Sequence, residues 1–231
     1  MSLAVLRGAD SDLPPREATL ARFAVALTAR PWSLDRGMCD EFAEHGLGED
    51  GIEAATAVVA IFNYLTRVAD ATGIEFDYAT PLPAFQPSHD QQPEPRPGRE
   101  SWPVLAGELR AFPRFGALDA AWRQWHEYVF DSDEPLGHRE RRLLARVAAE
   151  ESCDRWRADE LGKYEPENAT DELLVQFGRK LGRVPWQMGP ADLDRLREAG
   201  YPERALLHVI AVVALQSAES RVAMGRAFSR A

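Results

Sequence analysis

Cysteine is scarce in this chain, and its scarcity removes whole classes of structure. The 231 residues include two cysteines, Cys39 and Cys153. A disulfide scaffold relies on several bridges, and a zinc site built from cysteines needs more thiols than these. The five histidines are scattered, and no two stand at the i, i+4 spacing of a helical metal site. We therefore predict neither a disulfide framework nor a metal site.

Concentrated positive charge is lacking as well. The formal net charge is -10, and lysine and arginine are dispersed among aspartate and glutamate. No basic stripe is available for a phosphate backbone, so we expect no nucleic-acid partner. No charged segment followed by an apolar core and a cleavage site opens the chain, which makes a cytoplasmic location the expectation.

Long uninterrupted apolar runs and cofactor motifs are also missing. The two most apolar segments, near residues 50–72 and 203–226, contain charged residues within the roughly 20 residues that a bilayer span needs, so we expect no membrane insertion. We find no P-loop, dinucleotide glycine motif or nucleophile elbow. No cofactor is predicted.

The chain does contain an internal repeat. Residues 17–69 align without a gap on residues 171–223, and 16 of the 53 positions are identical. The shared positions include two Pro-Trp pairs, at residues 31–32 and 185–186, and the glycines Gly46 and Gly200. Such self-similarity predicts one supersecondary unit used twice, here within a single all-α domain.

Each unit is predicted to contain three helices. The first, at about residues 17–29 and 170–183, has apolar positions at helical spacing and stops before the Pro-Trp pair. A short amphipathic helix follows and ends at Gly46 or Gly200. The third helix is apolar around most of its circumference, which is typical of the centre of a bundle or of a subunit interface.

The segment between the repeats has a different character. Residues 78–101 contain six prolines and are predicted to be a linker. Two helices are expected after it, at residues 102–112 and 118–130, and a long amphipathic helix from residue 137 to about 163.

Several segments together resemble a known family. They are ARPWSL at 29–34, EHGLGED at 44–50, VVAIFNYLTRVAD at 58–70, GIEFD at 73–77 and RERRLLARVAA at 139–149, the last leading to Cys153. The chain resembles the AhpD-like, or carboxymuconolactone decarboxylase, superfamily. The resemblance implies a helical bundle made of residues 1–77 as a first repeat without a thiol motif, the linker 78–101, and residues 102–231 as a second repeat with a remnant active-site helix.

The family's redox motif is incomplete here. Active members carry Cys-x-x-Cys-x-x-x-His with an upstream glutamate. By position, Cys153 matches the first cysteine, Trp156 the second, Glu160 the histidine and Arg141 the glutamate. No intramolecular disulfide can form within this motif. Cys39 could serve instead only if its Cα lay within about 7 Å of that of Cys153, and we interpret it as a small core residue.

The first functional hypothesis is a one-cysteine thiol peroxidase in antioxidant defence. Cys153 would attack a hydroperoxide as a thiolate, and an external thiol protein would reduce it. Arg155 or Arg157 would stabilise the thiolate, since nearby cations lower a thiol pKa, and Glu160 would relay the proton. The competing interpretation of Cys153 is a packing residue.

The second hypothesis is a redox-inactive member of the superfamily. It would bind a small apolar or acidic molecule in a pocket bounded by Trp156, Trp122 and Trp125, or serve a structural role. His126 could act as a base over this pocket, or be an ordinary residue of an aromatic helix. His208 is expected to be a hydrogen-bonded core residue. In either case the resemblance implies a homo-oligomer, a dimer or a trimer.

Overall fold

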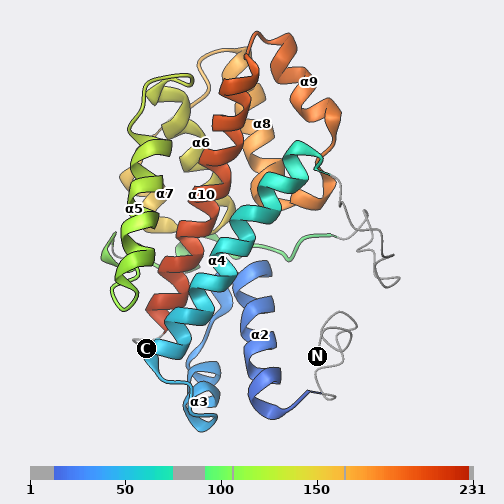
Figure 1. The fold of residues 1–231 in the computed structure, drawn as a ribbon. Coiled ribbons are helices and arrows are strands. Elements are labelled where there is room, and N and C mark those ends of the chain that lie inside the picture. The colour runs from blue at the N-terminus through green and yellow to red at the C-terminus, as the bar shows by residue number, and fades with distance from the viewer. Residues whose placement is uncertain (1–12, 75–91, 106, 164, 229–231) are drawn as a thin grey trace, which may run out of the picture.

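The computed structural model describes residues 13–74, 92–105, 107–163 and 165–228. All regular elements in these ranges are helices, which confirms the all-α class (Figure 1). The first repeat holds α2 (Pro15–Ala29), the 3₁₀ turn η2 (Pro31–Ser33), α3 (Arg36–Glu44) and α4 (Glu49–Thr72). Between the repeats lie η3 (Arg99–Ser101), η4 (Gly107–Arg110), α5 (Gly116–Phe130), α6 (His138–Glu151) and α7 (Arg155–Glu160). The second repeat holds α8 (Ala169–Arg183), η5 (Pro185–Gln187), α9 (Pro190–Glu198) and α10 (Glu203–Phe228).

The three helices expected in each repeat are present, in the same order and at the same spacing. Each element of the second repeat begins 154 residues after its counterpart in the first, as for α2 and α8 at Pro15 and Ala169. The helix ends follow the sequence signals. Gly46 and Gly200 adopt φ values of 69° and 98°, a left-handed conformation that suits glycine after a helix. Descent of both repeats from one duplicated unit stays a prediction.

Helix α10 is the centre of the bundle. It packs against α4, α6, α8 and α5, and its residues from Val209 to Ala223 are almost all buried. Figure 1 shows α10 flanked by α5 and α8, with α4 crossing it. Helix α4 is different, because Val58, Phe62 and Leu65 on its outer side are 56%, 61% and 50% exposed.

Among the residues that the structure describes, α4 and α10 are long and apolar enough to cross a membrane. The most apolar stretch of α10 is 83% buried inside the protein and that of α4 is 44% buried. The core helix of a soluble protein passes the same length and composition test, so this is weak evidence for a membrane protein.

The expected helix at 102–112 is wrong, because the described residues of this segment, 102–105 and 107–112, contain only the short 3₁₀ turn η4. The physical reason is a distant side chain. Arg226 of α10 donates hydrogen bonds from Nη1 to the carbonyls of Glu108 and Ala111, at 3.0 and 2.7 Å. These carbonyls therefore bond to α10 rather than to following turns of a helix.

The single long helix expected at 137–163 is also wrong. The chain forms α6, breaks at residues 152–154 and resumes as α7. Cys153 has a φ of 57°, in the left-handed region. The carboxylate of Asp154 accepts hydrogen bonds from the N–H of Arg157 and the hydroxyl of Ser220, and it caps α7 in doing so.

We predict that Gly225→Ala destabilises the protein. A Cβ at residue 225 would lie 2.3 Å from Oγ1, 2.6 Å from Cγ2 and 3.0 Å from Cβ of the buried Thr56, so α4 and α10 would have to separate. Overpacking of this kind costs about 1–3 kcal/mol. Thermal unfolding should show a Tm lower by about 2–4 °C for each kcal/mol.

The control for this prediction is Gly116→Ala, since a Cβ there meets nothing within 4 Å. Its Tm should be unchanged or slightly higher. Adding Thr56→Ala to Gly225→Ala removes two of the three close atoms and should recover part of the loss. A wild-type Tm for Gly225→Ala alone would contradict the close packing of α4 on α10.

Candidate functional site

A pocket of about 300 Å³ lies where α5, α7, η4 and α10 meet. Its lining residues are Gly107, Arg110, Ala111, Asp119, Trp122, Arg123, His126, Trp156, Arg157 and Glu219. Three of the four residues predicted to form a pocket, Trp122, His126 and Trp156, are therefore brought together. They come from α5 and α7, which the chain separates by more than twenty residues.

The two indole rings are held by neighbours from other segments. Trp122 meets Phe112 edge to face, with ring centroids 5.5 Å apart. The guanidinium carbon of Arg110 lies 5.1 Å from the ring centroid of Trp156, a cation–π contact. A Cβ at Gly107 would lie 2.9 Å from the ring of Trp156, so the backbone of η4 approaches this indole as only glycine permits.

The polar centre of the pocket is a pair formed by His126 and Glu219. His126 Nδ1 lies 2.5 Å from Oε1 of Glu219, which is 2% exposed. Burial lowers the pKa of His126, but the hydrogen bond and the charge of Glu219 outweigh it, and the pKa is raised. A carboxylate that accepts from Nδ1 leaves Nε2 as the nitrogen available to a ligand.

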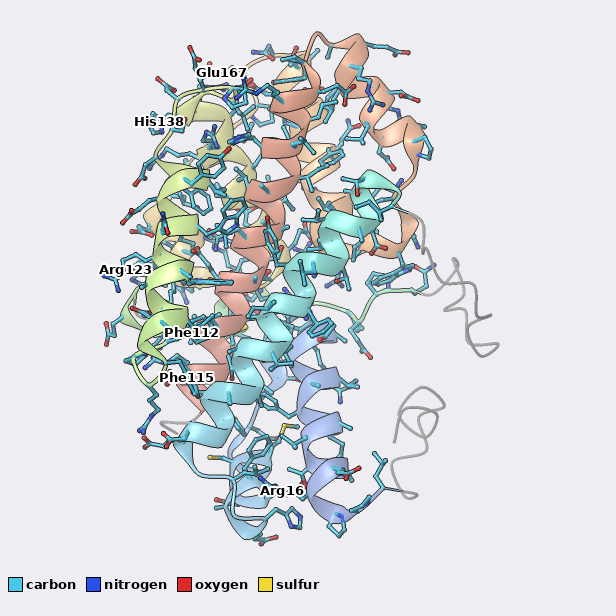
Figure 2. The ribbon with its side chains drawn as sticks, in the orientation of Figure 1. Arg16, Phe112, Phe115, Arg123, His138 and Glu167 are labelled. Carbon is cyan, nitrogen blue, oxygen red and sulfur yellow. The ribbon has the colours of Figure 1, made fainter. Side chains whose placement is uncertain are left out.

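Every other charged residue of the wall has a partner of opposite charge. Arg110 Nη1 lies 2.8 Å from the Asp154 carboxylate, Arg123 Nη2 2.6 Å from Asp119, and Arg157 Nη1 2.5 Å from Glu160. Arg123 lies on the outer side of α5 (Figure 2). A charged ligand would have to compete with these pairs, so the electrostatics of the pocket favour an uncharged one.

Trp125 does not join the pocket. It is 37% exposed and stacks on Tyr128, with ring centroids 5.2 Å apart, and it also meets Tyr64 edge to face. On α5, His126 follows Trp122 by four residues and lies on the same face, whereas Trp125 directly precedes His126 and so lies about 100° from it around the helix.

The residues predicted to assist Cys153 are engaged elsewhere. Arg155 Nε lies 3.7 Å from the Asp159 carboxylate on the surface, and Glu160 pairs with Arg157. Neither makes a described contact with the thiol. The charges that act on Cys153 belong instead to Arg96, Arg183 and Glu151.

Cys153 itself is in an environment that suppresses thiolate formation. It has no exposed surface, and burial raises its pKa to about 11, against weaker opposing effects of Arg96 and Arg183. At pH 7 only about one molecule in ten thousand would carry a thiolate. Both cysteines are free, and Cys39 packs half-buried in the apolar cluster of the first repeat.

Arg141, which stands in the place of the family's glutamate, is a buried structural residue. Its guanidinium donates to the carbonyls of Leu136, Val129 and Glu134, and Nη1 lies 2.9 Å from Nδ1 of His208. Burial, Arg141 and Arg204 lower the pKa of His208. The prediction that His208 is a hydrogen-bonded core residue is confirmed.

Sequence reasoning missed several residues of this region. Glu219 and Arg110 reach the pocket from distant segments, and no local pattern marks them. A second cavity, of about 400 Å³, is lined by Trp32, Trp186, Arg67 and Arg221 among others. The sequence does mark these four residues, because they form two of the identical pairs of the internal repeat.

A third pocket contains none of the residues predicted to form a site. This pocket of about 380 Å³ lies between α6 and α8 and is lined mainly by their outer residues. Within the part of the chain that the structure describes, no three His, Cys, Asp or Glu side chains are placed to hold a metal ion.

We predict that Cys153 is unreactive in the native protein. In a Cys39→Ser variant, where Cys153 is the remaining thiol, alkylation by iodoacetamide at pH 7–8 should be at least about a hundredfold slower than in the unfolded chain, because burial disfavours the thiolate. The rate should show no inflection below about pH 9. Cumene hydroperoxide consumption should be the same with and without Cys153→Ser. An inflection below pH 8.5, with turnover lost in Cys153→Ser, would support the peroxidase instead.

Comparison of the chain with protein-family models, with curated proteins and with solved structures finds no match.

Proposed function

We propose that this protein binds a small, flat, uncharged organic molecule in the pocket between α5, α7 and α10. The observation that carries the proposal is the convergence of Trp122, Trp156 and His126 on one hollow whose charged residues are all paired. The volume of about 300 Å³ is at the lower end for ligand sites, which suits a molecule of one or two rings. The sequence leaves open whether the ligand is apolar or acidic. The pairing of all charged residues in the pocket wall favours the apolar ligand.

The wall offers a ligand both stacking and hydrogen bonding. The two indoles provide aromatic faces, and such contacts add about 0.5–1.5 kcal/mol beyond area burial. Nε1 of Trp122 and Oε2 of Glu219 are buried without hydrogen-bond partners. The imidazole of His126, with Nδ1 held by Glu219, can donate from Nε2 to a ligand carbonyl when protonated and accept a proton when neutral.

Thiol peroxidase activity at Cys153, which the AhpD-like resemblance implies, is the competing proposal. It requires a reactive thiolate, and full burial with a pKa near 11 does not support one. Membership of the AhpD-like superfamily itself rests on the sequence segments alone and remains a proposal.

We predict that acetophenone, a flat uncharged ketone, quenches the tryptophan fluorescence of the protein saturably. Trp156→Ala should weaken its binding about tenfold, because stacking and apolar burial are lost. Trp102→Ala is the matched control, since Trp102 lines neither this pocket nor the 400 Å³ cavity. Benzoate, which differs by a charge, should not displace the ketone. Equal affinity of Trp156→Ala and wild type would exclude this pocket.

The same titration tests the role of His126 through pH. Protonated His126 donates to the ketone, so affinity should fall as pH rises through the raised pKa of this residue. Glu219→Gln removes the charge that raises the pKa, and the midpoint should move to lower pH. A pH-independent affinity in both proteins would leave His126 outside the binding interaction.

We further propose that the chain self-associates through the outer side of α4. Val58, Phe62 and Leu65 are each at least half exposed there. They follow the i, i+4, i+7 spacing of a single helix face. Val25 of α2, 56% exposed, extends the apolar surface. A helix face of this kind is suited to a symmetric contact with a second copy.

We predict a dimer or trimer by light scattering, against a chain mass of 25.8 kDa. Phe62→Lys should shift the mass toward one chain, because a lysine on the contact face would be buried without a counter-charge. Leu207→Lys, at a residue 56% exposed on α10, is the matched control and should leave the mass unchanged. A wild-type mass of one chain at micromolar concentration would refute the proposal.

A further inference from the structure

The cavity of about 400 Å³ lies at the junction of the two repeats. Equivalent residues of both repeats line it: Trp32 and Trp186 from the 3₁₀ turns, and Arg67 and Arg221 from α4 and α10. Arg183 at the end of α8 and Pro185 at the start of η5 also contribute. The cavity is thus walled by two indoles and by arginines, and it shares no lining residue with the pocket of α5 and α7.

The two central arginines make reciprocal contacts. Arg67 Nη2 donates to the carbonyl of Gly182 at the end of α8, at 3.1 Å, and Arg221 Nη2 donates to the carbonyl of Thr28 at the end of α2, at 2.7 Å. Thr28 and Gly182 occupy the same place in the two repeats. Each arginine is 4% exposed and therefore more than nine-tenths buried.

Both guanidinium groups have unused donors. A guanidinium has five N–H groups. Arg67 uses Nη1 for the carbonyl and side chain of Asn63 in addition to its bond to Gly182, and Arg221 uses Nη1 for the carbonyl of Ser217. Nε of each arginine is buried with no hydrogen-bond partner. Buried polar groups are normally satisfied, so these donors are an exception that needs an explanation.

In the part of the chain that the structure describes, the arginines also lack ion-pair partners, although the charge of Asp70 acts on Arg67. Among the described residues, no carboxylate forms an ion pair with either guanidinium. Burial lowers the pKa of Arg67 to about 10, with Asp70 opposing. The pKa of Arg221 is lowered by burial and by Arg67, so the two positive charges repel one another inside the protein.

The other charges of the wall do not remove this excess. The charged lining residues are Arg67, Arg183, Arg221, Asp70, Glu94 and Glu151. Glu151 is 3.0 Å from Arg96 and Glu94 is 3.8 Å from Arg30, so both have cations of their own. Asp70 is exposed. The C-termini of α2 and α8 each contribute about half a negative charge. Arg67, Arg183 and Arg221 against Asp70 leave two positive charges, and the two helix ends reduce this excess to roughly one.

We propose that this cavity binds a small organic carboxylate. Its carboxylate group lies against the guanidinium groups of Arg67 and Arg221, and its apolar body lies between Trp32 and Trp186. Arginine is suited to this role, because its planar fork matches a carboxylate and stays charged when buried. The ligand supplies the negative charge and the hydrogen-bond acceptors that the protein leaves out.

Benzoate is the probe, measured by calorimetric titration at constant ionic strength against sodium chloride. Saturable binding of one benzoate per chain is expected, with a Tm that rises as ligand concentration exceeds Kd. Arg221→Met and Arg67→Met should each weaken binding at least about tenfold, since a charge-assisted hydrogen bond to the carboxylate is lost. Acetophenone should not compete for the site, because it lacks the charge.

Two further variants keep the test decisive. Arg183→Met, at a half-buried residue of the wall, replaces the central variants if these fail to fold, and it should weaken benzoate binding by at least about threefold. Arg197→Met removes a surface arginine of α9 paired with Glu203 and should bind benzoate as wild type does. Trp156→Ala should also bind it normally. No saturable binding beyond chloride, or wild-type affinity in the arginine variants, would overturn the proposal.

Discussion

Two buried arginines join the halves of this protein, and the positions of the other helices depend on them. Each guanidinium lies on the C-terminal end of the first helix of the other repeat, where the last carbonyls have no partner within the helix. A cation there satisfies a carbonyl and meets the negative end of the helix dipole. The ends of α2 and α8 are therefore fixed against α4 and α10. The turns that carry Trp32 and Trp186 begin two residues later, which brings both indoles to the same cavity.

Helix α10 lies between the two cavities and contributes a wall residue to each, Glu219 to one and Arg221 to the other. Glu219 and Arg221 are two residues apart, so their side chains lie on nearly opposite sides of the helix. Glu219 meets His126 on the side of α5, and Arg221 meets Thr28 on the side of α2. The first side has every charge paired, whereas the second has an excess of positive charge. We infer that this difference in charge balance, rather than a difference in size, favours an uncharged ligand in the first cavity and a carboxylate in the second.

Local sequence patterns predicted the helices of the repeats. Long-range contacts determined the structure of the segment 102–112 and the environment of Cys153, which local patterns did not predict. Helix periodicity, the Pro-Trp pairs and the terminal glycines act within a few residues, so the bounds of α2 and α8 were close to expectation. The segment 102–112 differs because Arg226, more than a hundred residues away, takes its carbonyls. Cys153 differs for a similar reason. Its neighbours in sequence, Arg155 and Arg157, point to other partners, and burial decides its pKa.

The equivalent faces of α4 and α10 both depart from the usual relation between polarity and burial. The face on α10 is buried although it is partly polar, and the face on α4 is exposed although it is apolar. Val58, Phe62 and Leu65 of α4 correspond, 154 residues later, to Val212, Gln216 and Glu219 of α10. The α10 residues are at most 2% exposed and include two polar side chains, bonded to Arg157 of α7 and His126 of α5.

The α4 residues are apolar and at least half exposed. Burying a polar group costs free energy unless it is hydrogen-bonded, and exposing apolar surface costs free energy unless it is covered. A buried polar face is therefore a candidate for part of a functional site. An exposed apolar face is a candidate for a surface that a partner covers. The helices α5 and α7 cover α10 and form the pocket on it. The corresponding cover for α4 would come from a second chain.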